Sequence, residues 1–485
     1  MDEATSPCDA AHAAGLVASS TTKNGVYGFE TTPNDPLINL NGAFDVLPIT
    51  LSWIVLIALL GLLVLQAILV FKYFGFMVSH TPSLQQPTGA EFSPRVAVVL
   101  CLRGSDPSLN ACLESLLAQD YGNFEVHFVI DAPEDPAVKT IRKFLERNSN
   151  SLKSKTIFLT EGSDSNLARD TCSLKNQSLI AAITDAEKAI EVFALVDADG
   201  AVEKNWLSGL VAPMIDPEVG ATTGSRWFAP ADRNPGSLVR QTWNAAALPQ
   251  MHFYNIPWGG ALAIRRSAIQ ACDLLSHWSH GFCEDTMLTK ILASKNFRVT
   301  QVPGVIVQCA ESTSLPEVIN WISRQLLTVR LHHNSWPLVL GHAIFSGGCL
   351  AGALVMIGWC FWAQHFLQGT RLTIAVVIFL AANVLLLQVI QLANRQGRIN
   401  ALAHHPQTSN KLSSNEAIAS SPAPGLFGSL LTQLLYPLIA VKAALMRKVQ
   451  WRGITYTIGP GKKISLDGYQ PYQESDDNTG NNTSL

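Results

Sequence analysis

The chain has 485 residues, of which 48 % are hydrophobic and only 15 % are charged. Its formal net charge of −3 argues against a nucleic-acid-binding protein, which needs a basic surface to neutralise phosphates. Nine cysteines are scattered without a CxxC pair or a Cys/His cluster, so we expect neither a zinc site nor a disulfide framework. The low share of charged residues is typical of a protein that is part soluble domain and part membrane.

The N-terminal part predicts a tail, a membrane helix and a linker. Residues 1–45 are polar and slightly acidic with no early apolar run, so we expect a disordered tail and not a signal peptide. Residues 46–73 form a predicted transmembrane helix, because 46–71 is uncharged and long enough to cross a hydrocarbon core of about 30 Å. The basic Lys72 then favours an outside-to-inside crossing. Residues 80–94 are a Pro-rich linker.

Residues 95–335 change character. Short β-branched runs, such as RVAVVLCL, FEVHFVI and VFALV, alternate with amphipathic helical stretches. This alternation predicts an α/β domain with a mostly parallel sheet that is covered by helices on both faces.

The C-terminal part returns to membrane-like patterns. Residues 336–393 hold two uncharged stretches and are predicted to form a transmembrane hairpin, and residues 394–425 form a low-complexity linker. Residues 426–460 begin with an apolar stretch of only about 16 residues, so we expect an interfacial or re-entrant segment, with a spanning helix as the alternative. The polar residues 461–485 are predicted to be disordered. Basic residues beside the spans place residues 95–335 on the cytoplasmic side.

Two carboxylates follow a predicted buried strand at 193–196. Asp197 and Asp199 would lie at the carboxyl edge of the sheet, where α/β proteins bind ligands. One carboxylate can meet a ribose while the other binds a divalent cation, Mg²⁺ or Mn²⁺, that neutralises a diphosphate. An isolated pair of this kind is more often a solvated turn or a helix cap, but its place after an apolar strand favours ligand binding.

A second predicted strand ends at Asp131, and Asp135 follows closely. Both acids would lie at the same sheet edge. Asp135 also suits the N-cap of the helix that starts at Pro136. The sequence does not choose between Asp131 and Asp135 as a ligand-binding acid.

Two later motifs carry charge. Glu284 and Asp285 precede a predicted helix, where they would serve either as caps or, near a diphosphate site, as a general base toward an acceptor hydroxyl. Arg324 lies in the helical stretch 316–332. Its guanidinium suits a departing diphosphate, and the alternative is a basic anchor just before a membrane span.

In this order the motifs resemble the inverting family-2-type glycosyltransferases, especially the ceramide glucosyltransferase branch and its bacterial relatives. Those proteins have three acidic sites followed by a (Q/R)xxRW motif on a GT-A-type nucleotide-sugar domain. Here the last motif reads Trp321-xx-Arg324-Gln325, so the arginine is kept while the first position and the final aromatic differ. The tail motif Trp451-Arg452-Gly453 is also similar to that branch.

The resemblance implies roles for the matched residues. The predicted nucleotide-sugar-binding residues are Arg103, Asp131, Asp135, Lys175, Asp197 and Asp199, with Asp199 as the metal ligand. The predicted catalytic residues are Asp285 as the base, its neighbour Glu284, and Arg324 at the leaving group. The predicted acceptor side comprises Trp258, Gly259, Gly260, Trp321 and Gln325.

The resemblance therefore implies a multi-pass membrane enzyme that moves a hexose, with glucose expected, from a UDP-sugar to a hydroxyl of a membrane lipid of the ceramide or diacylglycerol type. The expected product is a β-glycolipid. Two alternatives stay open: a processive polysaccharide synthase, and a membrane transporter or scaffold whose α/β domain only binds nucleotide. The absence of a GxxxxGK[ST] loop argues against an NTPase.

Overall fold

The computed structural model describes residues 36–79, 92–148, 151–159, 171–230, 232–402 and 422–472. The chain divides into two compact units, Met1–Thr50 and Leu51–Leu485, and the second holds all the described strands. Most of the predicted N-terminal tail lies outside the described residues. Its last part does not match the prediction, because helix α1 (Pro36–Ser79) already begins at Pro36. Residues 80–91 and 403–421, in the two predicted linkers, also lie outside the described residues.

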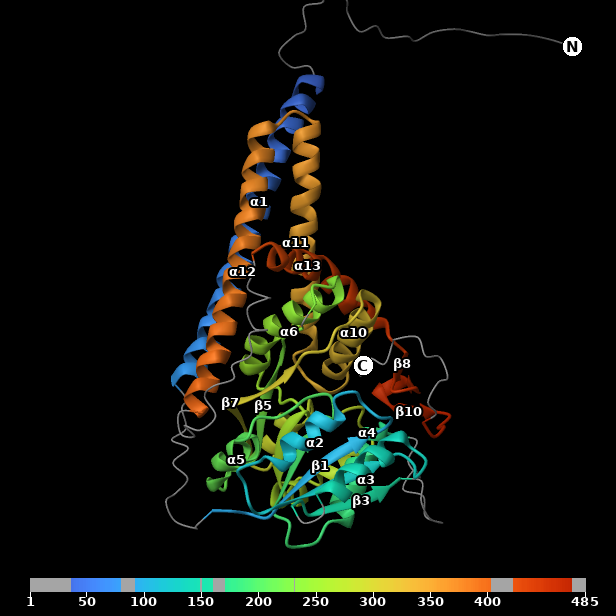
Figure 1. The fold of residues 1–485 in the computed structure, drawn as a ribbon. Helices are drawn as coiled ribbons and strands as arrows, with labels where there is room; N and C mark the ends of the chain where they lie inside the picture. Colours follow the sequence, from blue (N-terminus) through green and yellow to red (C-terminus); the bar gives the residue numbers. More distant parts are fainter. Residues whose placement is uncertain are drawn as a thin grey trace, which may run out of the picture. The chain divides into compact units, whose positions relative to one another are not determined.

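A seven-stranded sheet forms the centre of the second unit (Figure 1). Its strands are β1 (Val96–Leu102), β2 (Phe124–Ile130), β3 (Ser154–Phe158), β4 (Val192–Val196), β5 (Val219–Phe228), β6 (Ala261–Arg265) and β7 (Arg298–Cys309), in the order β3-β2-β1-β4-β6-β5-β7. Neighbouring strands are parallel except at β6, which pairs antiparallel with β4 and β5. The predicted α/β fold with a mostly parallel sheet is confirmed.

Helices cover both faces of the sheet. They are α2 (Leu109–Leu117), α3 (Pro136–Arg147), α4 (Leu174–Asp185), α5 (Trp206–Val211), α6 (Pro235–Tyr254), α7 (Arg266–Ala271), α8 (Leu274–Trp278), α9 (Leu288–Ala293) and α10 (Leu315–His332), with a 3₁₀ turn η1 (Ala212–Ile215). In β1, Val96 and Val98 enter one buried cluster while Ala97 and Val99 enter the other. Successive side chains of a strand point to opposite faces, so burial on both faces explains why β1 is apolar throughout.

Four described helices are long and apolar enough to cross a membrane. They are α1, α11 (Trp336–Trp362), α12 (Phe366–Leu402) and α13 (Pro422–Leu445). Large apolar side chains on them are exposed, among them Ile57 at 67 % and Val355 at 71 %. Apolar surface of this extent needs a cover, which a bilayer supplies, and we therefore describe the chain as a membrane protein.

Two of these helices differ from the prediction in extent. Helix α12 continues to Leu402, nine residues into the predicted linker. Helix α13 is continuous over 24 residues although it contains Pro437, so the segment has no re-entrant break. In Figure 1, α13 lies across α11 and beside α6 and α10, whereas α11 and α12 run along each other.

A small antiparallel sheet follows α13. Its strands are β8 (Lys448–Trp451), β9 (Ile454–Ile458) and β10 (Ile464–Asp467), with a 3₁₀ turn η4 (Pro460–Lys462) between the last two. The prediction of a disordered tail from residue 461 is therefore wrong for β10, whose alternating side chains Ile464 and Leu466 are buried. Residues 473–485 lie outside the described residues.

Candidate active site

A cavity of about 180 Å³ opens at the carboxyl edge of β1 and β4, and we call it the polar cavity. Loops after these strands, the start of α4, helix α10 and the turn between β8 and β9 surround it. Twelve of the fourteen predicted site residues line it: Arg103, Lys175, Asp197, Asp199, Trp258, Gly259, Gly260, Glu284, Asp285, Trp321, Arg324 and Gln325. The sheet topology thus brings together motifs that lie more than 200 residues apart.

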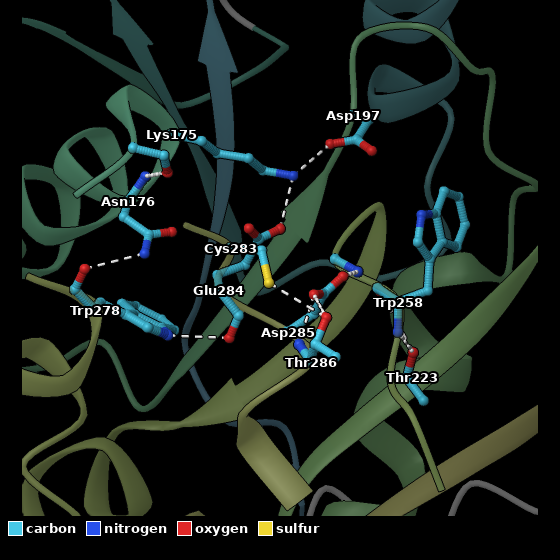
Figure 2. Close-up of polar contacts among 12 residues, drawn as sticks. Lys175, Asn176, Asp197, Thr223, Trp258, Trp278, Cys283, Glu284, Asp285 and Thr286 are labelled. Carbon is cyan, nitrogen blue, oxygen red and sulfur yellow. Dashed lines mark hydrogen bonds and ion pairs between the residues drawn. The ribbon is translucent and has the colours of Figure 1, made fainter. Parts of the chain in front are cut away.

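Lys175 lies between two acids of the polar cavity (Figure 2). Its Nζ is 2.8 Å from Asp197 Oδ1 and 2.7 Å from Glu284 Oε1. Burial would raise the pKa of Asp197, but the Lys175 ammonium overcomes this effect and holds that pKa below its usual value. Asp199 forms no ion pair with any described residue, and burial together with the charge of Asp197 raises its pKa to about 7 against the opposing effect of Arg226. The Asp pair therefore consists of one charge-paired carboxylate and one that needs a cation or a proton.

The two carboxylates fit a divalent cation that takes its other ligands from a substrate. Carboxylate oxygens are suited to Mg²⁺ or Mn²⁺, which commonly bind one or two protein carboxylates plus phosphate oxygens and water. No group of three or more His, Cys, Asp or Glu residues in the described ranges is placed to hold a metal. The raised pKa of Asp199 is the sign of a buried acid that a cation would stabilise in its charged form.

Asp285 is held by three hydrogen bonds. Its Oδ2 accepts one from Gly259 N–H at 2.8 Å, and its Oδ1 accepts two from the backbone and hydroxyl of Thr286 at 2.6 and 2.8 Å. A Cβ on Gly259 would lie 1.9 Å from Glu284 Oε1, and one on Gly260 would lie 2.6 Å from Asp197 Oδ2. The loop before β6 therefore contains glycines because carboxylates pack directly against its backbone.

The loop that carries Glu284 and Asp285 is fixed from both sides. Trp278 Nε1 donates to the carbonyl of Glu284 at 3.0 Å, and the Phe282 N–H donates to His332 Nε2 at 3.0 Å. Burial and the neighbouring Asp285 raise the pKa of Glu284 to about 6, against the opposing effect of Lys175. Glu284 is only 2 % exposed, and its carboxylate forms an ion pair with Lys175 at 2.7 Å. This pair holds the Lys175 ammonium in place.

Asp131 and Asp135 do not line the polar cavity. Asp131 is fully buried, with Arg103 bound to one oxygen and the Tyr469 hydroxyl donating to the other at 2.7 Å. Asp135 caps α3, since its side chain accepts from Ala137 N–H at 2.8 Å. The capping alternative for Asp135 is what the structure shows, and a nucleotide contact through Asp131 would have to displace or include Tyr469.

Helix α10 supplies Arg324 to the polar cavity. Its guanidinium lies 5.1 Å from the ring centre of Trp451. Burial and the nearby cations Arg452 and Arg226 lower the pKa of Arg324 to about 10, so it remains charged at neutral pH and favours an anion beside it. Ser314 and Glu317 form a capping box that fixes the start of this helix.

The sequence interpretation missed three residues of the site. Arg226, on β5, and Arg452, in the turn between β8 and β9, line the polar cavity, and Tyr469 closes over Asp131. Arg452 and Gly453 have φ values of +50° and +76°, as in a tight hairpin turn. The tail motif Trp451-Arg452-Gly453 was a usable signal for Arg452, whereas neither Arg226 nor Tyr469 belongs to a local pattern.

A second cavity, of about 210 Å³, adjoins the polar cavity, and we call it the apolar cavity. Its walls come from α1, α6, α10, α11, α12 and α13, and include Leu69, Val70, Leu386, Leu387 and Ile390. Both cavities are lined by Arg226, Trp258, Asp285, Gln325 and Thr328. Asp285 therefore faces a polar site on one side and a space between the apolar helices on the other.

Residues 54–464 match the family model described as glycosyl transferase family 21. The chain belongs to this family. Family 21 membership confirms the resemblance to the ceramide glucosyltransferase branch that the motifs predict.

Three individual proteins are also similar to this chain, each over part of its length or at low sequence identity. An N-acetylglucosaminyltransferase of Rhizobium meliloti (strain 1021) is 27 % identical over 262 residues, which are 50 % of this chain and 56 % of that protein. The mannosyltransferase PcManGT of Pyrobaculum calidifontis, solved with GDP-Man and Mn²⁺, is 17 % identical with a TM-score of 0.42 and covers 81 % of this chain and 99 % of its own. TarS of S. aureus is 15 % identical with a TM-score of 0.32 over 78 % of this chain and 100 % of its own.

Proposed function

We propose that this family 21 protein transfers a hexose, with glucose expected, from a UDP-sugar to a hydroxyl group of a membrane lipid, with inversion at the anomeric carbon. The acceptor is of the ceramide or diacylglycerol type, and the product is a β-glycolipid. The reaction takes place on the cytoplasmic side of the membrane and requires Mg²⁺ or Mn²⁺.

The observation that carries this proposal is the position of Asp285 at the junction of the two cavities. A sugar nucleotide suits the polar cavity, where acids and arginines converge. A lipid chain suits the apolar cavity, because apolar side chains of the candidate membrane helices form its walls. A hydroxyl group at the end of that chain would then meet the donor sugar beside Asp285.

In this mechanism Asp285 accepts the proton of the acceptor hydroxyl while the hydroxyl oxygen bonds to the anomeric carbon. The bond from that carbon to the diphosphate oxygen breaks, and its electron pair leaves with the nucleotide. Arg324 stabilises the charge that develops on this leaving group. Gly259 and Thr286 orient the base through hydrogen bonds to its two oxygens. A cation bound by Asp199 and Asp197 would neutralise further charge on the diphosphate.

Basic residues at one end of the candidate membrane helices support the proposed cytoplasmic position of residues 95–335. Tyr73 OH donates to Asn394 Oδ1 at 2.6 Å, so the C-terminal ends of α1 and α12 lie together. Arg398 in α12 is 2.5 Å from Glu203 of the catalytic domain. With Lys72 and Arg395 nearby in sequence, the basic ends of both helices face the catalytic domain, which favours a cytoplasmic position.

The test is an assay of lipid labelling. Purified protein in detergent is incubated with labelled UDP-glucose, other UDP-sugars, membrane lipid and Mn²⁺, and label is counted in the organic phase. We expect lipid-borne label that disappears with EDTA and falls about 10²- to 10⁴-fold in Asp285→Asn, the range typical of a general base. Asp216→Asn is the matched control, because this partly exposed acid pairs with Arg298 away from both cavities.

Each outcome separates the proposal from its alternatives. Label that stays in aqueous polymer would indicate a polysaccharide synthase. UDP-sugars that bind but are never consumed would indicate a binding role without transfer. Label in the organic phase that is unaffected by Asp285→Asn would refute the assignment of the base.

A further inference from the structure

Arg226 lies at the junction of the polar and apolar cavities and lines both. It stands near the end of β5, and only 9 % of the residue is exposed. Its charge favours the ionised forms of Asp197 and Asp199 and therefore reaches the acidic pair. A buried cation at this position contacts whatever occupies the boundary between the two cavities.

Three aromatic rings surround the Arg226 guanidinium. Its central carbon lies 4.9 Å from the ring centre of Phe228, 5.0 Å from Trp258 and 4.9 Å from Trp321. Rings at these distances attract a cation and fix the plane of the guanidinium without using its N–H donors. Trp321 is one of the two positions at which the chain departs from the (Q/R)xxRW pattern, the other being Gln325, and its ring lies against Arg226.

The Arg226 side chain forms no hydrogen bond or ion pair with any residue in the described ranges, and its buried Nε has no partner. Its neighbour Arg240 shows the contrast. Arg240 lies 4.3 Å from the same Phe228 ring, but it pairs with Glu311 and donates to the carbonyl of that residue. Since an unpaired buried charge is costly, the guanidinium of Arg226 is suited to an anion that arrives with a ligand.

We propose that Arg226 is a donor-binding residue whose guanidinium contacts the phosphate of the sugar nucleotide next to the transferred sugar. This proposal rests on the proposed function. Phosphate is the anion that matches a planar fork of N–H donors, and the adjacent Asp197 and Asp199 mark the side where the donor diphosphate lies. When the sugar–oxygen bond breaks, the electron pair remains on that phosphate, where Arg226 and Arg324 share its charge.

The test compares Arg226→Met with Arg240→Lys in the full chain. Binding of UDP and of UMP is measured by calorimetry with Mn²⁺, and thermal unfolding is measured without ligand. We expect Arg226→Met to weaken UDP binding about 10- to 100-fold, as for a charge-assisted hydrogen bond. UMP lacks the second phosphate, so its affinity should change less than about twofold. The unfolding temperature should not fall, because an unpaired charge has been removed.

Arg240 lines neither cavity, and lysine at this position keeps a positive charge beside Glu311. The Arg240→Lys variant should therefore bind UDP with the affinity of the parent protein. Arg226→Met that binds UDP like the parent overturns the assignment. An equal loss of affinity for UDP and UMP in Arg226→Met, together with a lower unfolding temperature, would indicate a structural role and also overturn the assignment. Normal UDP binding with loss of binding to phosphatidic acid vesicles would assign the guanidinium to a lipid phosphate and also overturn it. A parent protein that binds no UDP overturns the proposed function as well.

Discussion

Lys175→Met tests the ion pairs that support the polar cavity. Methionine keeps most of the side-chain length but removes the ammonium that touches Asp197 and Glu284 at 2.8 and 2.7 Å. Removal of one partner from a buried pair typically costs about 3–5 kcal/mol. We expect the lower value, about 3 kcal/mol, because the side chain of Asp197 is 29 % exposed and Glu284 can take up a proton. For an α/β domain of the size of residues 95–335 the loss corresponds to roughly 6–12 °C in unfolding temperature.

The pH dependence of this loss follows from Glu284. Its pKa is already raised to about 6 in the parent, and without Lys175 it rises further. A raised carboxyl pKa makes the folded state bind more protons than the unfolded state, so the variant is least stable at high pH and recovers as pH falls from 8 to 5.5. The added change Glu284→Gln should restore most of the loss, since it removes the unpaired charge.

The assay is thermal unfolding of ligand-free protein at pH 8 and at pH 5.5, with Lys155→Met as the control. Lys155 pairs with Asp185 at 2.6 Å, but both side chains are almost half exposed, so its loss should cost less than about 1 kcal/mol. An equal unfolding temperature for Lys175→Met and Lys155→Met, or no recovery from Glu284→Gln, would refute the reasoning.

Two further predictions concern the loop of the candidate base. Gly259→Ala places a methyl group 1.9 Å from the present position of Glu284 Oε1, so turnover of UDP-glucose should fall at least about 10-fold, whereas Gly122→Ala, with open space around its Cβ position, should be neutral. Equal turnover in the two variants would contradict this. Burial lowers the pKa of His332 to about 4, so charging this imidazole destabilises the folded protein as pH falls from 6.5 toward 4, by about 3 kcal/mol in total, and removes its capacity to accept from Phe282 N–H. His332→Gln keeps an acceptor without titrating and should flatten that slope in pH-dependent unfolding, and an unchanged slope would contradict the assignment.

The central strands were predictable because they are buried on both faces. The apolar runs around β1, β2 and β4 stand out from their surroundings, and the acids that follow β2 and β4 lie at the expected sheet edge. Strand β5 did not stand out, because its sequence VGATTGSRWF mixes glycine, threonine and a cation. Arg226 was missed for this reason, since its strand gave no periodic signal.

Some site residues could likewise be predicted from local motifs, whereas others depend on tertiary packing. Lys175, Asp197, Glu284 and Asp285 carry charge within short motifs, so the sequence identified them as candidates. One partner of Asp131 is Tyr469, which follows 338 positions later in a stretch that looks like a polar tail. Such a pairing depends on tertiary packing, and no local pattern reports it. Asp135 shows the opposite case, in which a local capping signal was sufficient.

The small sheet β8–β10 has a consequence for biosynthesis. It contributes Arg452 and Tyr456 to the polar cavity, and it follows the four long apolar helices that the structure describes. A ribosome synthesises the chain from its N-terminus, so the helices emerge and can enter the bilayer before this wall of the cavity exists. The polar cavity of a nascent chain is therefore incomplete while these helices emerge from the ribosome.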